Sequence, residues 1–318
     1  MRFKALLVAL TLLLSGLVAV PAAAAQDTAT IVSRQAITDR LVELRVHSDA
    51  LHQEVGVRLL LPRDWAKFPR RTWPTLYLLH GCCDGGTGYR TWTDKTDIAA
   101  FTANTNALIV MPEGGTVGFY SKWYDRSVDW ETFHLTELRQ LLQHEFRSGE
   151  QRAVAGLSMG GFGAFSYAAR RPGFFRAAAS YSGVVDTTFG GSLTTDALQK
   201  FVSDAGFDKN ALWGDPVAQA AVWAKYNPYD QAWRLRGTQL FLASGNGQPG
   251  PFDPPGAAPN QLEQVLGAQT AEMTDRLDQF GIRVTTDLYG PGTHSWPYWE
   301  RELHRSFPML MRSIGVAF

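Results

Sequence analysis

The chain has 318 residues, of which 45% are hydrophobic and 19% charged, so it can bury a sizeable core in one large α/β domain or two small ones. Its 30 basic and 30 acidic residues give a formal net charge of +0, without the concentrated positive charge typical of a nucleic-acid-binding protein. No nucleic-acid partner is therefore expected.

The amino-terminal segment has the pattern of an export signal. Two basic residues precede an almost unbroken apolar run over 5–20, and small residues then follow up to Ala25. The alternative is a transmembrane anchor, but the run is shorter than the ~20 residues that a spanning helix needs. We expect a signal peptide over 1–25, cleavage before Gln26, no transmembrane anchor, and a secreted or cell-envelope-associated protein of residues 26–318.

Short apolar strands alternate with helices along the rest of the chain. Strands are expected over 55–61, 75–79, 107–111, 152–155, 177–181, 239–243 and 283–289, and helices over 135–146, 160–169 and 261–280. This alternation predicts one α/β domain with a mostly parallel central sheet and helices on both faces. The segment 186–236 interrupts it, either as a cap or cleft wall or as a structural insertion.

The strongest chemical signal is the sequence Gly-Leu-Ser-Met-Gly over 156–160. It is the G-x-S-x-G pattern, and it stands between an expected strand and an expected helix, which is the context typical of the α/β-hydrolase fold. The sharp turn lifts the serine hydroxyl above the sheet, and the glycines avoid collisions with the neighbouring strand and helix. Ser158 is therefore the candidate nucleophile. The amide of Met159 begins the helix and is a candidate oxyanion donor.

A serine nucleophile needs a histidine base and an acid, which in this fold follow in the order serine, acid, histidine. His294 lies in a Gly- and Pro-rich loop after the last expected strand, where the chain can turn back over the sheet. His294 is the candidate base. Two residues are candidate acids: Asp253, in a Pro-rich loop, and Glu263, near the start of a helix. Their positions alone do not distinguish between them.

The loop after the second expected strand reads His-Gly-Cys-Cys over 80–83 and holds the only two cysteines of the chain. An amide just beyond the glycine supplies the second oxyanion donor in related motifs, so Cys82 is the candidate. Adjacent thiols lack the spacing of a zinc site. Neither cysteine is expected to be the nucleophile, because Ser158 fills that role. Neither a metal nor another cofactor is expected. Cys82 and Cys83 are either small side chains at a tight turn or a disulfide that stiffens the loop.

Four stretches resemble the antigen 85 mycolyltransferases, within the esterase-D-like group of α/β-hydrolases: ALIVMPEGGTVGFYSKWYD (107–125), AVAGLSMGG (153–161), LFLASGNGQPG (240–250) and GTHSWPYW (292–299). This resemblance implies a secreted serine esterase or acyltransferase that works through an acyl-enzyme. It also implies that Glu263, rather than Asp253, is the acid, and that Cys82 carries the second oxyanion amide.

The sequence departs from that family in the cysteine loop. Antigen 85 proteins have an acidic residue at the position of His80 and an arginine at that of Cys83, and both help hold trehalose. His80, Cys83 and Trp296 are retained as candidate substrate-binding residues for an ester or acyl-lipid, with a sugar hydroxyl as a possible acceptor. The alternatives are a plain secreted carboxylesterase without trehalose activity and a non-catalytic surface-binding protein that kept the fold.

Overall fold

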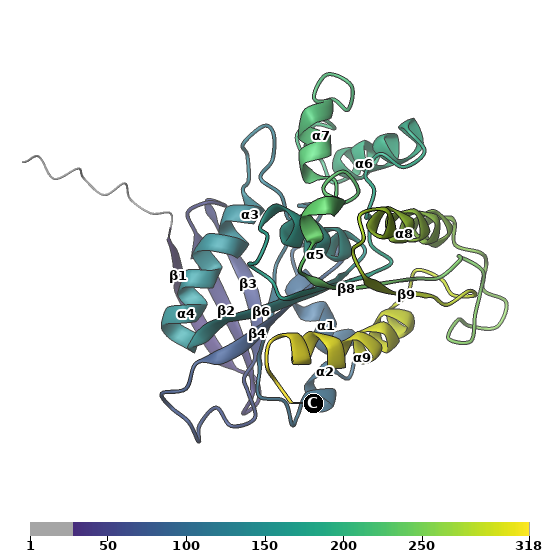
Figure 1. Ribbon diagram of the computed structural model, residues 1–318. Coiled ribbons are helices and arrows are strands. Elements are labelled where there is room, and N and C mark those ends of the chain that lie inside the picture. The colour runs from purple at the N-terminus through teal and green to yellow at the C-terminus, as the bar shows by residue number, and fades with distance from the viewer. Residues whose placement is uncertain (1–27, 318) are drawn as a thin grey trace, which may run out of the picture.

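The computed structural model describes residues 28–317 of the chain (Figure 1). The signal peptide expected over 1–25 therefore lies outside the described residues. Within the described range, no helix is both long and apolar enough to span a lipid bilayer.

One sheet runs through the described part of the molecule, with nine strands in the order β1-β2-β3-β5-β4-β6-β7-β8-β9. From β5 to β9 neighbouring strands are parallel, and β1, β2 and β3 extend the sheet in antiparallel fashion. The prediction of a mostly parallel sheet is confirmed. The strands are β1 (Ala29–Ala36), β2 (Leu41–Ser48), β3 (Gln53–Leu60), β4 (Trp73–Leu79), β5 (Leu108–Pro112), β6 (Ser148–Leu157), β7 (Ala177–Tyr181), β8 (Gln239–Ser244) and β9 (Val284–Leu288).

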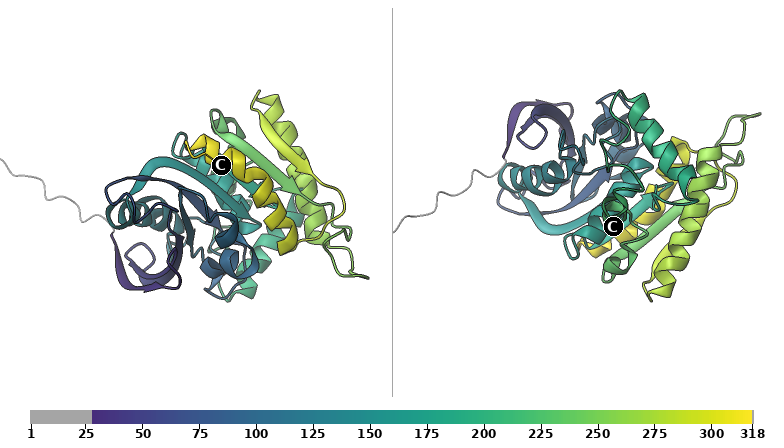
Figure 2. Two further views of the ribbon diagram at one scale, coloured as in Figure 1. Left: turned by 90° about the horizontal axis from the view of Figure 1, so that it is seen from below. Right: turned by 90° about the horizontal axis from the view of Figure 1, so that it is seen from above.

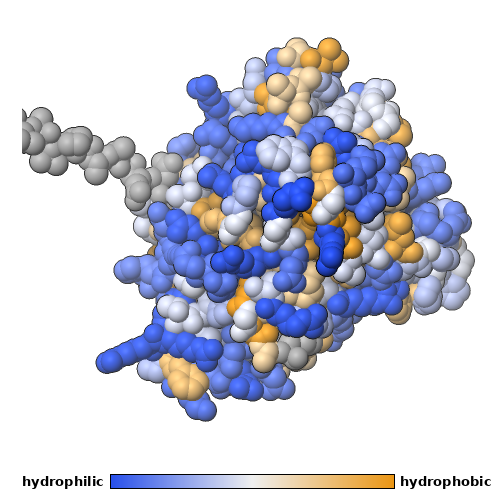
Figure 3. Space-filling model, in the orientation of Figure 1, coloured by the Kyte–Doolittle hydropathy of each residue, from blue (hydrophilic) through white to orange (hydrophobic). Residues whose placement is uncertain are grey.

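Helices cover both faces of this sheet, as predicted (Figure 1 and Figure 2). Helices α4, α5 and α8 pack on one face around one hydrophobic cluster, and α1 and α9 pack on the other face around a second cluster. The helices are α1 (Thr91–Lys95), α2 (Ile98–Phe101), α3 (Trp130–Thr132), α4 (Arg139–Phe146), α5 (Met159–Arg170), α6 (Ser192–Asp204), α7 (Ala220–Tyr226), α8 (Gln261–Gln279) and α9 (Trp296–Ser313). The surface seen in the same orientation is mostly hydrophilic, with scattered hydrophobic patches (Figure 3).

Several elements differ from the expectations. Strands β1 and β2 were not expected; β1 is an exposed edge strand whose side chains carry no continuous apolar signal, whereas β2 is mostly buried but polar residues interrupt its apolar ones. Strand β6 begins at Ser148, earlier than expected, since its first residues include polar side chains. The helix expected over 135–146 starts at Trp130, and its middle part, Phe133–Leu138, is a π-helix between α3 and α4.

The segment 186–236 contains α6 and α7, which project from the α5 side of the sheet at the top of Figure 1. A buried hydrogen bond links the first residue of this segment to the loop after α7: the side-chain amide of Asn227 donates to Asp186 Oδ1 at 2.8 Å. Thr188 also donates from its backbone N–H and its hydroxyl to the same carboxylate oxygen, each at 2.9 Å. The base of this segment is therefore fixed, and α6 is held in a defined place.

Candidate active site

Ser158 occupies the turn between β6 and α5. Its backbone has φ 51° and ψ −119°, in a region that side chains other than glycine rarely adopt. The flanking glycines are sterically required: a Cβ on Gly160 would lie 2.4 Å from the carbonyl oxygen of Leu79, and one on Gly156 would lie 2.3 Å from that of Gly160. This is the strained strand-to-helix turn that the G-x-S-x-G pattern predicts.

Ser158 lines a cavity of about 180 Å³. His294, the candidate base, lines the same cavity although it lies more than one hundred residues later in the chain. The other lining residues are Gly81, Cys82, Asp84, Phe119, Leu157, Met159, Val184, Leu198, Phe201, Leu262, Trp296 and Trp299. The fold thus brings the candidate nucleophile, base and both candidate oxyanion residues to one place. Asp84 and Trp299 were not singled out from the sequence.

The imidazole of His294 is held by Glu263. The Nδ1 atom of His294 lies 2.8 Å from Oε2 of Glu263, whose side chain is fully buried. Glu263 stands in the first turn of α8, where the side chain of Asn260 accepts a hydrogen bond from its backbone N–H at 2.8 Å. With the carboxylate accepting from Nδ1–H, the Nε2 atom of the neutral ring is left as an acceptor.

The other oxygen of Glu263 has its own donors. The hydroxyls of Ser182 and Ser244 each donate to Oε1 at 2.8 Å, and the backbone N–H of Gly245 donates at 2.6 Å. Donors of this kind fix the orientation of a buried carboxylate. Ser182 and Ser244 were not predicted, because a single serine after β7 and another at the end of β8 carry no distinguishing pattern.

Asp253 does not contact the imidazole ring through any described hydrogen bond. It accepts hydrogen bonds from the hydroxyls of Thr293 and Tyr298, the latter at 2.7 Å, and from the backbone N–H of Gly250 at 2.8 Å. Burial acts to raise the pKa of Asp253, but these donors outweigh it and leave the pKa below its usual value. Asp253 thereby braces the loop that carries His294.

The cysteine loop borders the cavity on another side. Cys82 is half-buried and lines the cavity, whereas Cys83 is exposed. Their sulfurs are joined in a disulfide between adjacent residues. The backbone N–H of Cys83, a residue with φ 73°, donates to the carbonyl oxygen of Thr116 at 2.8 Å. The loop is therefore held by a covalent link and by a hydrogen bond to a separate segment.

The remaining predicted substrate contacts lie in different settings. The side chain of His80 is 1% exposed and does not line the cavity; its Nε2 accepts from the backbone N–H of Gly114 at 2.7 Å. The geometry therefore does not support direct substrate binding by His80, because its ring supports the loop from beneath. Trp296 lines the cavity, with its ring edge-on to Trp92 and Trp299, each with centroids 5.3 Å apart.

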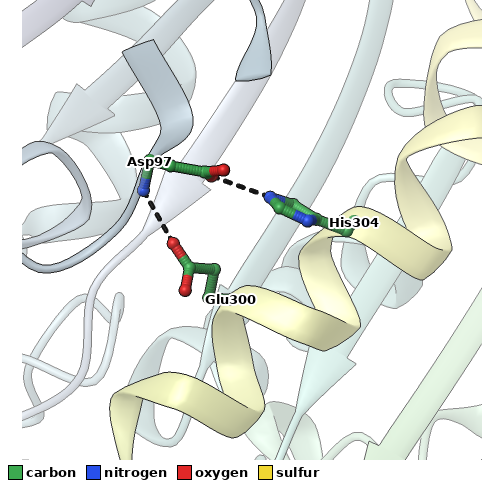
Figure 4. A group of neighbouring side chains, drawn as sticks. All are labelled: Asp97, Glu300 and His304. Atoms are coloured by element: carbon green, nitrogen blue, oxygen red, sulfur yellow. Dashed lines mark hydrogen bonds and ion pairs between the residues drawn. The ribbon is translucent and has the colours of Figure 1, made fainter. Parts of the chain in front are cut away.

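Asp97, Glu300 and His304 form a group whose ligand-type atoms all lie within 4.8 Å of one another (Figure 4). None of the three lines the cavity of Ser158. His304 Nε2 lies 2.8 Å from Asp97 Oδ1, and the backbone N–H of Asp97 donates to Glu300 Oε1 at 2.7 Å. These contacts fasten α9 to the start of α2 without requiring an ion.

Comparison with known proteins identifies the family. The family model described as "Putative esterase" matches residues 48–310 of the chain. The chain belongs to this esterase family. Membership confirms the resemblance to esterases that the sequence predicted.

Sequence relatives of this chain include Esterase Rv1288 of Mycobacterium tuberculosis, which is 37% identical over 265 residues, covering 79% of this chain and 55% of the relative. The chain thus spans about half the length of that relative. The diacylglycerol acyltransferase/mycolyltransferase Ag85B of Mycobacterium leprae is 30% identical over 254 residues, covering 76% of each chain. The predicted resemblance to the antigen 85 proteins is confirmed.

Solved structures share the fold of this chain. MPT51 (FbpC1) of Mycobacterium tuberculosis superposes with a TM-score of 0.73 at 22% identity, covering 87% of this chain and 100% of that one. An S-formylglutathione hydrolase of Agrobacterium tumefaciens gives a TM-score of 0.67 at 16% identity, covering 90% of this chain and 99% of that one. These similarities confirm the α/β-hydrolase fold.

Proposed function

We propose that this chain is a secreted serine esterase or acyltransferase that forms an acyl-enzyme on Ser158. The observation that carries the proposal is the 2.8 Å contact between His294 Nδ1 and Glu263 Oε2, made by an imidazole that lines the cavity of Ser158. A buried carboxylate on one ring nitrogen leaves the other free to act as a base, which is the arrangement a serine nucleophile needs.

The first half of the reaction uses four groups. Nε2 of His294 takes the proton of the Ser158 hydroxyl as the serine oxygen attacks the ester carbonyl. Backbone amides of Met159 and Cys82 donate to the oxyanion that forms; the Met159 amide has no intrahelical acceptor, since it belongs to the first turn of α5. Glu263 stabilises the imidazolium, which then gives its proton to the leaving alcohol as the tetrahedral intermediate collapses.

The second half transfers the acyl group to a new hydroxyl. His294 removes a proton from water, or from an acceptor alcohol, whose oxygen attacks the acyl-enzyme and releases Ser158. Relatives named as an esterase and as acyltransferases support both outcomes. Trehalose is not proposed as the acceptor, because position 80 holds a buried histidine and position 83 a cysteine in place of the acidic residue and the arginine implied by the resemblance.

Labelling with a fluorophosphonate tests the proposal. The folded wild-type protein should be labelled on Ser158, and Ser158→Ala should be neither labelled nor active on p-nitrophenyl esters. A wild-type protein that resists labelling would favour a non-catalytic surface-binding protein instead. Product analysis with and without sugar acceptors then separates hydrolysis from acyl transfer, since only transfer yields an acylated sugar.

A further inference from the structure

The cavity beside Ser158 has an apolar wall made by elements far apart in the sequence. Leu198 and Phe201 come from α6, and Phe119 from the segment after β5. Trp296 and Trp299 complete it from the start of α9. Aromatic and aliphatic side chains of this kind gain free energy by enclosing apolar groups, and they offer no partner to a negative charge.

The titratable groups that line this cavity disfavour an anionic occupant. They are His294, which the proposed mechanism uses, and Asp84. The carboxyl of Asp84 is 33% exposed and lies 3.7 Å from the ring of His80. A carboxylate carried by the acyl group of a substrate would meet the acidic side chain of Asp84 and no lysine or arginine among the lining residues.

The size of the cavity limits what it can enclose. Its volume is about 180 Å³, whereas pockets for drug-sized ligands measure about 300–1,000 Å³. An apolar protein cavity of about 150 Å³ holds one molecule of benzene. The space beside Ser158 therefore suits a group of roughly the size of one aromatic ring.

We infer that this cavity takes the acyl group of the substrate, that the acyl group is compact and carries no negative charge, and that Leu198 and Phe201 set the limit on its length. The inference rests on the proposed acyl-enzyme at Ser158. It assigns a role to the segment 186–236, because α6 supplies two of the residues that line the cavity. Substrates are then esters of short aliphatic or single-ring aromatic acids, and a long-chain acyl group does not fit inside.

The first measurement compares p-nitrophenyl butyrate, benzoate, octanoate and palmitate, all presented in the same detergent micelles. The expected result is that kcat/KM for butyrate and benzoate exceeds that for palmitate by more than about tenfold, since misfit in an apolar pocket changes kcat/KM by about 10- to 200-fold. The p-nitrophenyl ester of succinic acid, whose acyl group carries a charge, should be a poor substrate.

The second measurement changes the wall. Phe201→Ala and Leu198→Ala should raise kcat/KM for octanoate relative to butyrate by about tenfold, because a shorter side chain in the wall leaves room for a longer acyl chain. Phe201 is only partly buried, so its variant keeps the fold even where Leu198→Ala loses stability. Leu193→Ala is the matched control, because Leu193 lies on the same helix but is 60% exposed and outside the cavity. Its chain-length profile should equal that of the wild type.

Two outcomes overturn the inference: palmitate turned over as well as butyrate, or a Phe201→Ala profile identical to that of Leu193→Ala. Fluorophosphonate labelling of each variant separates this failure from failure of the proposed function. Labelled protein with no chain-length preference overturns only the acyl-group inference, whereas unlabelled wild-type protein overturns the proposed acyl-enzyme as well.

Discussion

The hydroxyl of Thr293 donates a hydrogen bond to Asp253, one residue before the histidine whose ring is bonded to Glu263. Asp253 and Glu263, between which sequence position alone did not choose the acid, thus hold the same loop at two points. Glu263 contacts the imidazole of His294, whereas Asp253 contacts the side chain of Thr293, the residue before it. Their substitutions should therefore have different effects.

Glu263→Gln should lower kcat by about 10³- to 10⁴-fold with little change in KM, because a neutral amide neither stabilises the imidazolium nor fixes its tautomer. Asp253→Asn keeps an oxygen acceptor for Thr293 and should lower kcat by less than about tenfold, by the same reasoning. Steady-state kinetics on a short-chain ester measures both. Equal losses in the two variants would contradict the assignment of Glu263 as the acid.

Removal of the disulfide should reduce turnover. In Cys82→Ser/Cys83→Ser the loop loses its covalent link, and we expect kcat to fall about tenfold with KM unchanged, since complete loss of one oxyanion donor costs about 10²- to 10³-fold. Treatment of the wild type with a phosphine reductant should reproduce this loss. The same reductant should not affect the double variant. Two free thiols in the mass spectrum of unreduced protein, or full activity after reduction, would contradict this role.

Stability should depend on pH through Glu302, a residue of α9 that is 1% exposed. Burial raises its pKa to about 7 from an ordinary value of 4.5, against the opposing effect of Arg301, whose Nε donates to it at 2.6 Å. The folded protein therefore binds this proton more tightly than the unfolded chain does. The stability it contributes is fully present below about pH 4.5 and is lost as pH rises through about 7.

Glu302→Gln removes this titration. Relative to the wild type, the variant should gain about 3 kcal/mol of unfolding free energy between pH 4.5 and pH 8, because each unit of pKa shift corresponds to about 1.4 kcal/mol. Urea denaturation at the two pH values measures the difference. Parallel pH profiles for the two proteins would show that Glu302 does not titrate in this window.

Export should remove the amino-terminal segment. Expressed in a secreting bacterial host, the protein should appear outside the cytoplasm with Gln26 as its first residue, since the small residues before it fit a signal-peptidase site. Amino-terminal sequencing of the exported protein measures this. Retention of residues 1–25 in a membrane fraction would instead indicate an anchor.

Much of the fold was predictable because buried parallel strands have a recognisable sequence pattern. Strands such as β5 and β7 are buried along their whole length and read as continuous apolar runs bounded by Pro, Gly or Ser. Strand β1 and helix α6 were not predictable in the same way. The former is mostly exposed, and the latter lies in a segment whose mixed composition fits either a wall or an insertion.

The sequence by itself determined Ser158 and His294 as candidates, because the constraints on them are local. A serine on a strand-to-helix turn needs glycines two residues away, and a histidine that turns back over a sheet needs a flexible loop. Position in the sequence left Asp253 and Glu263 level, and the family resemblance implied Glu263. Only the tertiary structure shows the contact itself, since both residues lie between β8 and the histidine loop and the packing of α8 places Glu263 within 2.8 Å of Nδ1. The apolar wall from α6 is likewise a product of folding, since the sequence of that helix does not show that Leu198 and Phe201 line the same cavity as Ser158.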